Sequence, residues 1–290
     1  MTTEEFIRNV RRQASIPISQ VTFQTTDFIE MMNAEMQTFL LPWIDRIREE
    51  FFLQNDDQVY SVGGKYRIHY RASGCTLRDV KLVIDGAEFS PNQVAFDNSE
   101  DRYAGYYIRG QHVHIIEPIS APNLVRLVYM VRPNRNVVAG AATTIASKTA
   151  TTITLASTPS VFSSPIAFDV IRNKEPYDFP DKGFDRAGTL AAGVITVTDG
   201  NGTTDFSTGD IVALAGQSPV VMLPEPAALL LAQQVALRCL EALGDADGVQ
   251  LALQSRGTMA KEVAHLLSNR VKGDPKQIVT HPSNPLWRAD

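Results

Sequence analysis

The sequence predicts an α+β protein in which a helical bundle, built from both ends of the chain, carries an inserted all-β module of sandwich or barrel type. Apolar residues recur at helical spacing within residues 1–58 and again within 221–271. Between them, residues 59–220 alternate apolar and polar residues in short runs separated by Gly, Pro, Asn and Asp. Neither helical range can bury its apolar stripe alone, so the two ranges are expected to form one domain.

A short polar helix is predicted at the start of the chain. Thr2 and Glu5 have the spacing of a capping box, in which each side chain accepts a hydrogen bond from the other residue's backbone. The helix is expected to end near Ala14, because the proline in the Ile-Pro-Ile segment 16–18 disfavours helical backbone before it.

A second, longer helix is predicted with Thr25 or Thr26 as its cap, running through Phe51 with a kink at Pro42. Its apolar face is too wide to be left in water, so we expect it to complete the bundle. Methionines cluster on it and could form an adaptable binding groove, but core packing is the preferred interpretation for Met31, Met32 and Met36.

The clearest strand of the β module is expected at residues 65–71. Alternation places Tyr66, Ile68 and Tyr70 on an apolar face and leaves the other face charged, with Lys65, Arg67, His69 and Arg71. Further strands are expected at 80–84, 106–108, 112–116, 124–131, 153–155, 167–171, 194–198 and 211–214. These strands form either one module or two small ones that divide near residues 134–147.

A pair of helices is predicted from Leu223 to Arg270. Two prolines flank Glu225 at the start of the first helix, and Gly244 provides its left-handed end. Asp245 or Asp247 is expected to cap the second helix. That helix should bury Leu251, Met259, Ala260, Val263, Ala264 and Leu267, and should expose Arg256, Lys261, Glu262 and Arg270.

The composition argues against several classes of protein. A formal charge of −5 with no basic block does not suggest a sequence-independent grip on nucleic acid. The distant Cys75 and Cys239 form no disulfide framework, and Cys239 is expected to be a buried thiol in a reducing compartment. An acidic N-terminus and the lack of an apolar run approaching about 20 residues predict neither a signal peptide nor a membrane span.

No catalytic, metal or cofactor site is predicted. His112 and His114 lie two apart on an expected strand, a spacing that metal sites use, but no further ligands accompany them. The Asp245–Gly248 segment resembles the start of a calcium loop, yet its glycine comes two positions early and Arg256 occupies the place of the last ligand. A polar strand face and a helix cap are the preferred interpretations, and an enzyme is not expected.

Several segments together suggest a family. They are the helix rich in Met and Phe, residues 107–118 (YIRGQHVHIIEP), residues 127–133 (LVYMVRP), Gly209–Asp210, and the Leu-Pro-x-Pro-led helix pair with Leu243–Asp245. In outline they cover most of the chain, which resembles the head-to-tail adaptor proteins of tailed bacteriophages. The resemblance implies a structural ring, usually dodecameric, in the virion neck, after assembly in the host cytoplasm. Its partners would be the portal protein and a tail, nozzle or terminator protein, with DNA only passing through the channel.

Residues 272–290 form the tail of the chain and are expected to be extended, because they contain three prolines and no periodicity. Within the resemblance, this tail is the expected anchor to the portal, through Lys272, Pro275, Ile278, Val279, Pro282, Pro285, Leu286, Trp287 and Arg288. The alternative is a disordered tail whose Trp287 folds back on its own helices.

Two other functions compete with the adaptor. A tail or baseplate component would use the β module for contacts with other tail proteins. A carbohydrate-binding module, the less favoured of the two, would stack sugars on Tyr103, Tyr106, Tyr107 and Tyr129. Strand alternation directs most of these rings toward a core instead.

Overall fold

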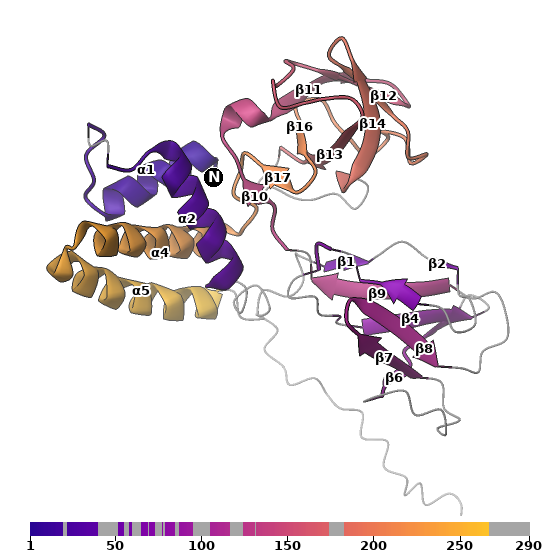
Figure 1. Ribbon diagram of the computed structural model, residues 1–290, viewed down its shortest axis with the longest axis horizontal. Helices are drawn as coiled ribbons and strands as arrows, with labels where there is room; N and C mark the ends of the chain where they lie inside the picture. Colours follow the sequence, from indigo (N-terminus) through magenta and orange to yellow (C-terminus); the bar gives the residue numbers. More distant parts are fainter. Residues whose placement is uncertain are drawn as a thin grey trace, which may run out of the picture.

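A computed structural model describes residues 1–19, 22–39, 52–54, 58–59, 65–68, 70–72, 77, 79–84, 87–94, 105–116, 124–130, 132–173 and 183–266. Helices gather at one end and strands form two groups at the other (Figure 1). The expected mixture of helix and sheet in an α+β arrangement is confirmed, and the described part contains four α-helices and a closed six-stranded barrel. Segregated helices and strands define this class of fold.

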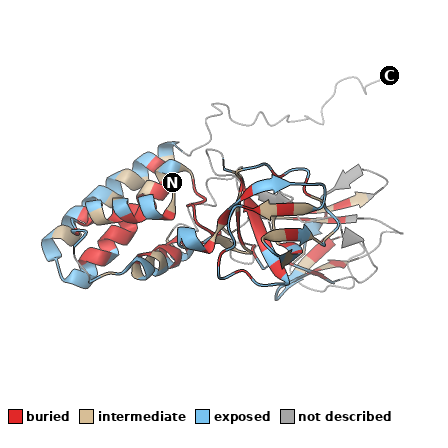
Figure 2. Ribbon diagram, turned by 90° about the horizontal axis from the view of Figure 1, so that it is seen from above, coloured by how far each residue is buried: buried red, intermediate tan, exposed pale blue. Residues whose placement is uncertain are grey.

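The four helices share one hydrophobic core. They are α1 (Thr3–Gln13), α2 (Thr25–Thr38), α4 (Glu225–Leu243) and α5 (Ala246–Leu266). Helix α4 packs against each of the other three, and most of its residues are buried (Figure 2). Residues from both ends of the chain therefore meet in one cluster, which includes Phe6, Met32, Leu231 and Val263.

The start of α1 follows the sequence prediction. The Glu5 amide donates to Thr2 Oγ1 at 3.2 Å, and the Thr2 amide donates to Glu5 Oε2 at 2.8 Å. This second bond is the main cause of a lowered pKa for the Glu5 carboxyl. The helix ends at the cap residue Ala14, as expected, and Ile16 turns back into the core.

Helix α2 begins one residue earlier than expected. Its cap is Gln24, whose amide donates to Asp27 Oδ2 at 2.7 Å, because a carboxylate in the first turn satisfies the free amides as a capping threonine would. Met32 and Met36 are buried, in agreement with core packing. The expected continuation through Pro42 lies outside the described residues, which resume at 52 with a strand instead of helix.

The turn between α4 and α5 is built as predicted, and so is most of the buried face of α5: Val263 is buried, and Met259 and Ala260 pack partly buried on the same core. The prediction is wrong at Leu251. Gly244 has φ 73°, and Asp245 Oδ1 accepts from the Gly248 amide at 2.9 Å. Leu251 is 68% exposed, whereas the neighbouring Ala252 is buried. One position rotates a side chain by about 100° around a helix, and α4 covers the face of Ala252.

Arg256, expected in solvent, instead donates to Gln234 Oε1 of α4 at 2.9 Å. The long Arg256 side chain reaches from the edge of α5 to the buried Gln234. Its partial burial is therefore caused by contact with α4, not by its position on α5. The expected positions Leu267 and Arg270 lie outside the described residues.

Helix α4 also corrects the expectation that no apolar run approaches a membrane-spanning length. Its length and composition would suffice to cross a bilayer, alone among the helices of the described ranges. Most of that apolar window is buried inside the protein against α1, α2 and α5. Packing in the core accounts for its composition.

The strands of residues 52–130 form a two-sheet unit. One sheet has the order β1-β9-β4-β5, with β2 also paired to β9, and the other has the order β3-β8-β7-β6. Buried side chains from both sheets, such as Tyr66, Leu82, Val113 and Leu127, form its core. The strands are β1 (Phe52–Gln54), β2 (Gln58–Val59), β3 (Lys65–Arg67), β4 (Asp79–Ile84), β5 (Ala87–Phe89), β6 (Asn92–Gln93), β7 (Gly105–Arg109), β8 (His112–Ile116) and β9 (Leu124–Met130).

A barrel unit follows, closed in the order β11-β12-β15-β14-β13-β16 around a separate core that includes Phe168, Ile195 and Phe206. Two short parallel strands, β10 (Arg135–Asn136) and β17 (Gln217–Ser218), flank it with the 3-10 turn at Ala139–Ala141. The barrel strands are β11 (Thr143–Lys148), β12 (Thr152–Leu155), β13 (Ile166–Ile171), β14 (Arg186–Ala191), β15 (Val194–Val197) and β16 (Ile211–Leu214). Of the two arrangements that the sequence allowed, the strands adopt the one with two cores.

The eight further strands predicted from the sequence are present with ends within one residue of expectation. The expected strand 65–71 is wrong in its second half: β3 ends at Arg67, Tyr70 is 56% exposed and Arg71 is 2% exposed. A turn at Tyr70–Arg71 breaks the alternation, because Arg71 pairs with a carboxylate of the barrel unit. Strands β11 and β14 were missed, since Thr, Ala and Gly weaken their alternation, and so were the two- and three-residue strands β1, β2, β5, β6, β10 and β17.

We predict that Gly188→Ala lowers the free energy of unfolding by about 1–3 kcal/mol, because a Cβ there would meet Ile195 Cγ2 at 2.7 Å and the Thr196 carbonyl oxygen at 2.9 Å. Gly140→Ala is the matched control, with no atom within 4 Å of its added Cβ. Chemical denaturation measures both, and equal stabilities of the two variants would contradict the tight packing of β14 against β15.

Candidate functional site

The residues predicted to anchor the chain to a partner, within 272–290, all lie outside the described residues. The described part instead presents a junction at which the helices, the barrel unit and the two-sheet unit meet. Polar side chains that are far apart in sequence converge there. This junction is the candidate functional site, since it determines how the three parts are held together.

Arg71 is the centre of the contact between the two-sheet unit and the barrel unit. Its Nη1 lies 2.8 Å from Asp169 Oδ2 and its Nη2 lies 3.0 Å from Asp169 Oδ1, a bidentate pair. Its guanidinium also bonds Asp185 and lies 4.1 Å from the centroid of the Phe184 ring. Phe184 in turn packs on the core of the two-sheet unit. One arginine thus joins two hydrophobic cores.

Every part of the Asp169 carboxylate is engaged. Beyond Arg71, its oxygens accept from the amide of Gly216 at 2.8 Å, the amide of Asp185 at 2.9 Å and Asn134 Nδ2 at 2.8 Å. Asn134 also donates to the Gln217 carbonyl at 3.0 Å. A buried charge is tolerated when it is paired and hydrogen-bonded in this way.

The electrostatics of the pair are set by burial and by mutual attraction. Burial raises the pKa of Asp169, and the hydrogen bonds and charge of Arg71 oppose that rise. Burial likewise acts to lower the pKa of Arg71, but the hydrogen bonds and charge of Asp169 outweigh it and the pKa lies above its usual value. Without Arg71, Asp169 would be a buried carboxylate with no cationic partner, whereas Arg71 without Asp169 would keep its contact with Asp185.

Hydrogen bonds to backbone groups join the helices to the barrel unit. Asn33 Nδ2 donates to the Asn136 carbonyl at 3.1 Å, and the Asn136 amide donates to Asn33 Oδ1 at 2.7 Å. The Thr3 amide and hydroxyl both donate to the Pro219 carbonyl, at 3.0 and 2.9 Å. The Val221 amide donates to the Met1 carbonyl at 3.0 Å, so the N-terminus pairs with the segment that leads into α4.

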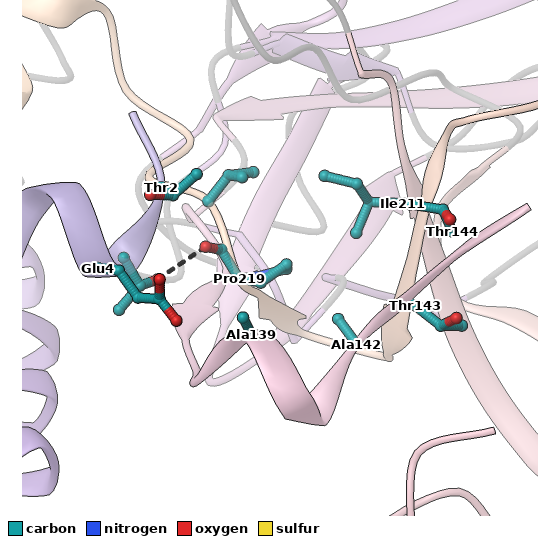
Figure 3. A pocket seen from close by; sticks show the side chains of 10 residues that line it. Thr2, Glu4, Ala139, Ala142, Thr143, Thr144, Ile211 and Pro219 are labelled. Atoms are coloured by element: carbon teal, nitrogen blue, oxygen red, sulfur yellow. Dashed lines mark hydrogen bonds between the residues drawn. The ribbon is translucent and has the colours of Figure 1, made fainter. Parts of the chain in front are cut away.

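A shallow groove of about 210 Å³ lies between the start of α1 and the barrel (Figure 3). Its walls are mainly methyl and methylene groups, and Glu4 is the ionisable residue among those that line it. The lining residues are Thr2, Thr3, Glu4, Ala139, Ala142, Thr143, Thr144, Ile211, Pro219 and Val220.

The residues weighed for chemistry lie apart from this junction. His112 is exposed, while His114 is half-buried and stacked on Tyr107 with ring centroids 4.6 Å apart. Within the described ranges, no three His, Cys, Asp or Glu side chains are placed to hold a metal. Asp245 caps α5, as preferred over a calcium ligand.

Cys239 is a buried thiol, as expected, and burial raises its pKa to about 11. Of the four tyrosines considered for sugar stacking, Tyr106 is buried and Tyr107 is half-buried against His114. The side chains of Tyr103 and Tyr129 lie outside the described ones.

No protein-family model matches the chain, and no curated protein matches it in sequence. The junction was also missed by sequence reasoning, although one signal was present. Asp169 is the single charged residue in the run IAFDVI, and a carboxylate in an apolar strand implies a buried cationic partner. The sequence does not say that this partner is Arg71, 98 positions away.

We predict that Arg71→Met lowers the free energy of unfolding by about 3–5 kcal/mol, because it leaves the Asp169 carboxylate buried without its cation. Hydrogen exchange at the Gly216 and Asp185 amides, which donate to that carboxylate, should become faster.

Arg186→Met is the matched control. Arg186 is equally buried, pairs with Asp199 and lies 5.0 Å from the Phe206 ring centroid, but all three residues belong to the barrel unit. It should destabilise the barrel without a matching loss of contact to the two-sheet unit. Identical exchange patterns in the two variants would show that Arg71 does not hold the units together.

Proposed function

We propose that this protein is a head-to-tail adaptor of tailed bacteriophages. In this proposal it forms a homo-oligomeric ring, usually dodecameric, in the virion neck, after assembly in the host cytoplasm. The ring joins the portal at the capsid vertex to a tail, nozzle or terminator protein and continues the DNA channel. The protein is structural, with no catalytic activity, cofactor, metal or membrane partner.

One observation carries the proposal: helices from the two ends of the chain share a hydrophobic core, and the β units occupy the sequence between them. This order matches the layout of the adaptors that the sequence resembles, in which a helical bundle is common and a β module is inserted. We propose accordingly that residues 1–58 and 221–271 form the bundle domain and residues 59–220 the insertion. Strand β1 at Phe52–Gln54 moves the start of the β part slightly earlier.

The physical properties of the chain suit a ring component. A ring of identical subunits uses two different surfaces of each subunit in a closed head-to-tail contact. The formal charge of −5 limits adhesion to DNA that must slide through a channel. The Arg71–Asp169 pair would hold the two β units in a constant orientation relative to one another, which repeated contacts around a ring require.

A tail or baseplate component is the second candidate. The β units lie to one side of the helices and present much exposed surface (Figure 2), which is suited to contacts with other tail proteins. If the protein is a tail or baseplate component, its assembly would not require the portal.

Negative-stain imaging of the purified chain, alone and mixed with the portal of the same virus, tests the proposal. We expect rings that stack coaxially on the portal with matching rotational symmetry. A chain that stays monomeric in both samples, or that assembles on tail proteins but never on the portal, contradicts the adaptor function.

We further predict that deletion of 272–290 leaves the melting temperature of the isolated protein nearly unchanged and abolishes assembly with the portal. The helices that share the core end before this segment, and Trp287→Ala alone should weaken portal binding by roughly 30-fold, as truncation of a central aromatic anchor does. Lys272→Ala, at the start of the same segment, is the milder comparison. A lower melting temperature with assembly retained would show that the tail stabilises its own fold.

A further inference from the structure

The outer face of the sheet β3-β8-β7-β6 is basic, although the chain as a whole is acidic. In β3, β7 and β8, Tyr66, Tyr106, Val113 and Ile115 are buried in the two-sheet core, and the residues that alternate with them point away from it. We call this outer surface the basic sheet face. It consists of Lys65, Arg67, Tyr107, Arg109, His112 and His114.

Strand register arranges these residues in two rows across the sheet. Lys65 pairs with His114, which pairs with Tyr107 on the next strand. In the second row, His112 lies between Arg67 and Arg109. Neighbouring rows are about 7 Å apart along a strand, and the outer strands of a row are about 10 Å apart. Lys65 therefore lies beside the aromatic pair of His114 and Tyr107, and Arg67 and Arg109 lie in the next row, so the six residues form a compact grid.

The cations of this grid are available to a ligand. Lys65, Arg67 and Arg109 are exposed, and within the described residues none of the three side chains has an ion-pair or hydrogen-bond partner. Three positive charges close together, with no partner in the part of the chain that the structure describes, repel one another, and an anionic ligand would relieve that repulsion. By contrast, the buried Arg71 and Arg186 each have carboxylate partners.

The platform beneath the grid is rigid. Tyr66, Val113 and Ile115 alternate with the outward residues and are buried in the core of the two-sheet unit. The side-chain positions are therefore set by paired backbone and not by a flexible loop. His114 and Tyr107 are already stacked, with an interplanar angle of 11°, and both are half-buried, so part of each ring remains open.

We propose that the basic sheet face binds a single strand of nucleic acid, with backbone phosphates on Lys65, Arg67 and Arg109 and a base stacked on the Tyr107–His114 pair. Proteins that hold single strands combine a cationic track with aromatic side chains on which bases stack. A four-stranded sheet with aromatics on its central strands has this geometry. An acidic peptide would use the cations but would gain nothing from the stacked rings, and the bases of a duplex are not open to stacking.

This proposal goes beyond the adaptor function and does not depend on it. The net charge of −5 reports the sum over the chain, whereas binding depends on the local potential of one face. The isolated chain should bind a strand whether or not it forms a ring on a portal.

Fluorescence anisotropy with a labelled oligo-dT strand of about 16 nucleotides tests the proposal with the full chain. Three phosphate contacts predict a slope of log affinity against log salt near −2, at roughly −0.7 per contact. The double variant Arg67→Gln with Arg109→Gln should bind at least tenfold more weakly at low salt and should reduce the slope to roughly −0.7.

The matched control is Arg8→Gln with Arg12→Gln, which removes two exposed arginines from α1 and leaves the basic sheet face intact. It should bind like the unchanged chain. An equal loss in the control, or no loss in the Arg67 and Arg109 variant, overturns the proposal.

The variant Tyr107→Leu tests whether the ligand of this face is a nucleic-acid strand or another polyanion. Loss of one stacking ring should weaken oligo-dT binding roughly tenfold with the salt slope unchanged. Poly-glutamate of equal charge should compete poorly with oligo-dT, and a labelled duplex should bind more weakly than the strand. Equal affinity for poly-glutamate, or an unchanged affinity of Tyr107→Leu for oligo-dT, would contradict the assignment of the face to nucleic acid.

Discussion

The buried ion pair of Arg71 with Asp169 is the constraint around which the β part of the molecule is arranged. Burying two charges is costly unless their hydrogen-bonding groups are all engaged. The protein meets this condition with donors from three segments of the chain, including Asn134 and Gly216. Arg71 comes from the two-sheet unit, whereas Asp169 and its other donors come from the barrel unit and the segment before it, so the pair forms only when the two units meet at this contact. The geometry of this polar network therefore decides how two separate hydrophobic cores are oriented.

The segment 216–221 extends that constraint to the helices. Its first amide donates to Asp169, its middle residues form β17 beside β10, and its last residues pair with Met1 and Thr3. Directly after it, α4 enters the helical core and contacts α1, α2 and α5. A change at the buried ion pair is thus separated from the helices by a few residues of hydrogen-bonded backbone. This short stretch of backbone therefore links the two-sheet unit, the barrel unit and the helices, which suits a subunit of an assembly.

The buried arginines and the arginines of the basic sheet face differ in whether they have carboxylate partners. The interior arginines are each matched to carboxylates, whereas the arginines of the basic sheet face have no such partners among the described residues. A total charge of −5 conceals this division, because acidic residues elsewhere outnumber the cations of one sheet. Composition led to the expectation of no grip on nucleic acid, and only strand register shows that six cationic and aromatic residues lie on one surface.

The sequence by itself determined the local elements: the capping box of Thr2, the left-handed end at Gly244, and eight strands with nearly correct ends. Those signals act over a few neighbouring residues, so they can be read without knowledge of the rest of the chain. The tertiary structure alone decided that Leu251 is exposed, that Arg71 is buried and that the strands form two cores. Burial depends on which distant surface covers a residue, and neither the partner of Arg71 nor the exposure of Leu251 beside the covered Ala252 is encoded in local spacing.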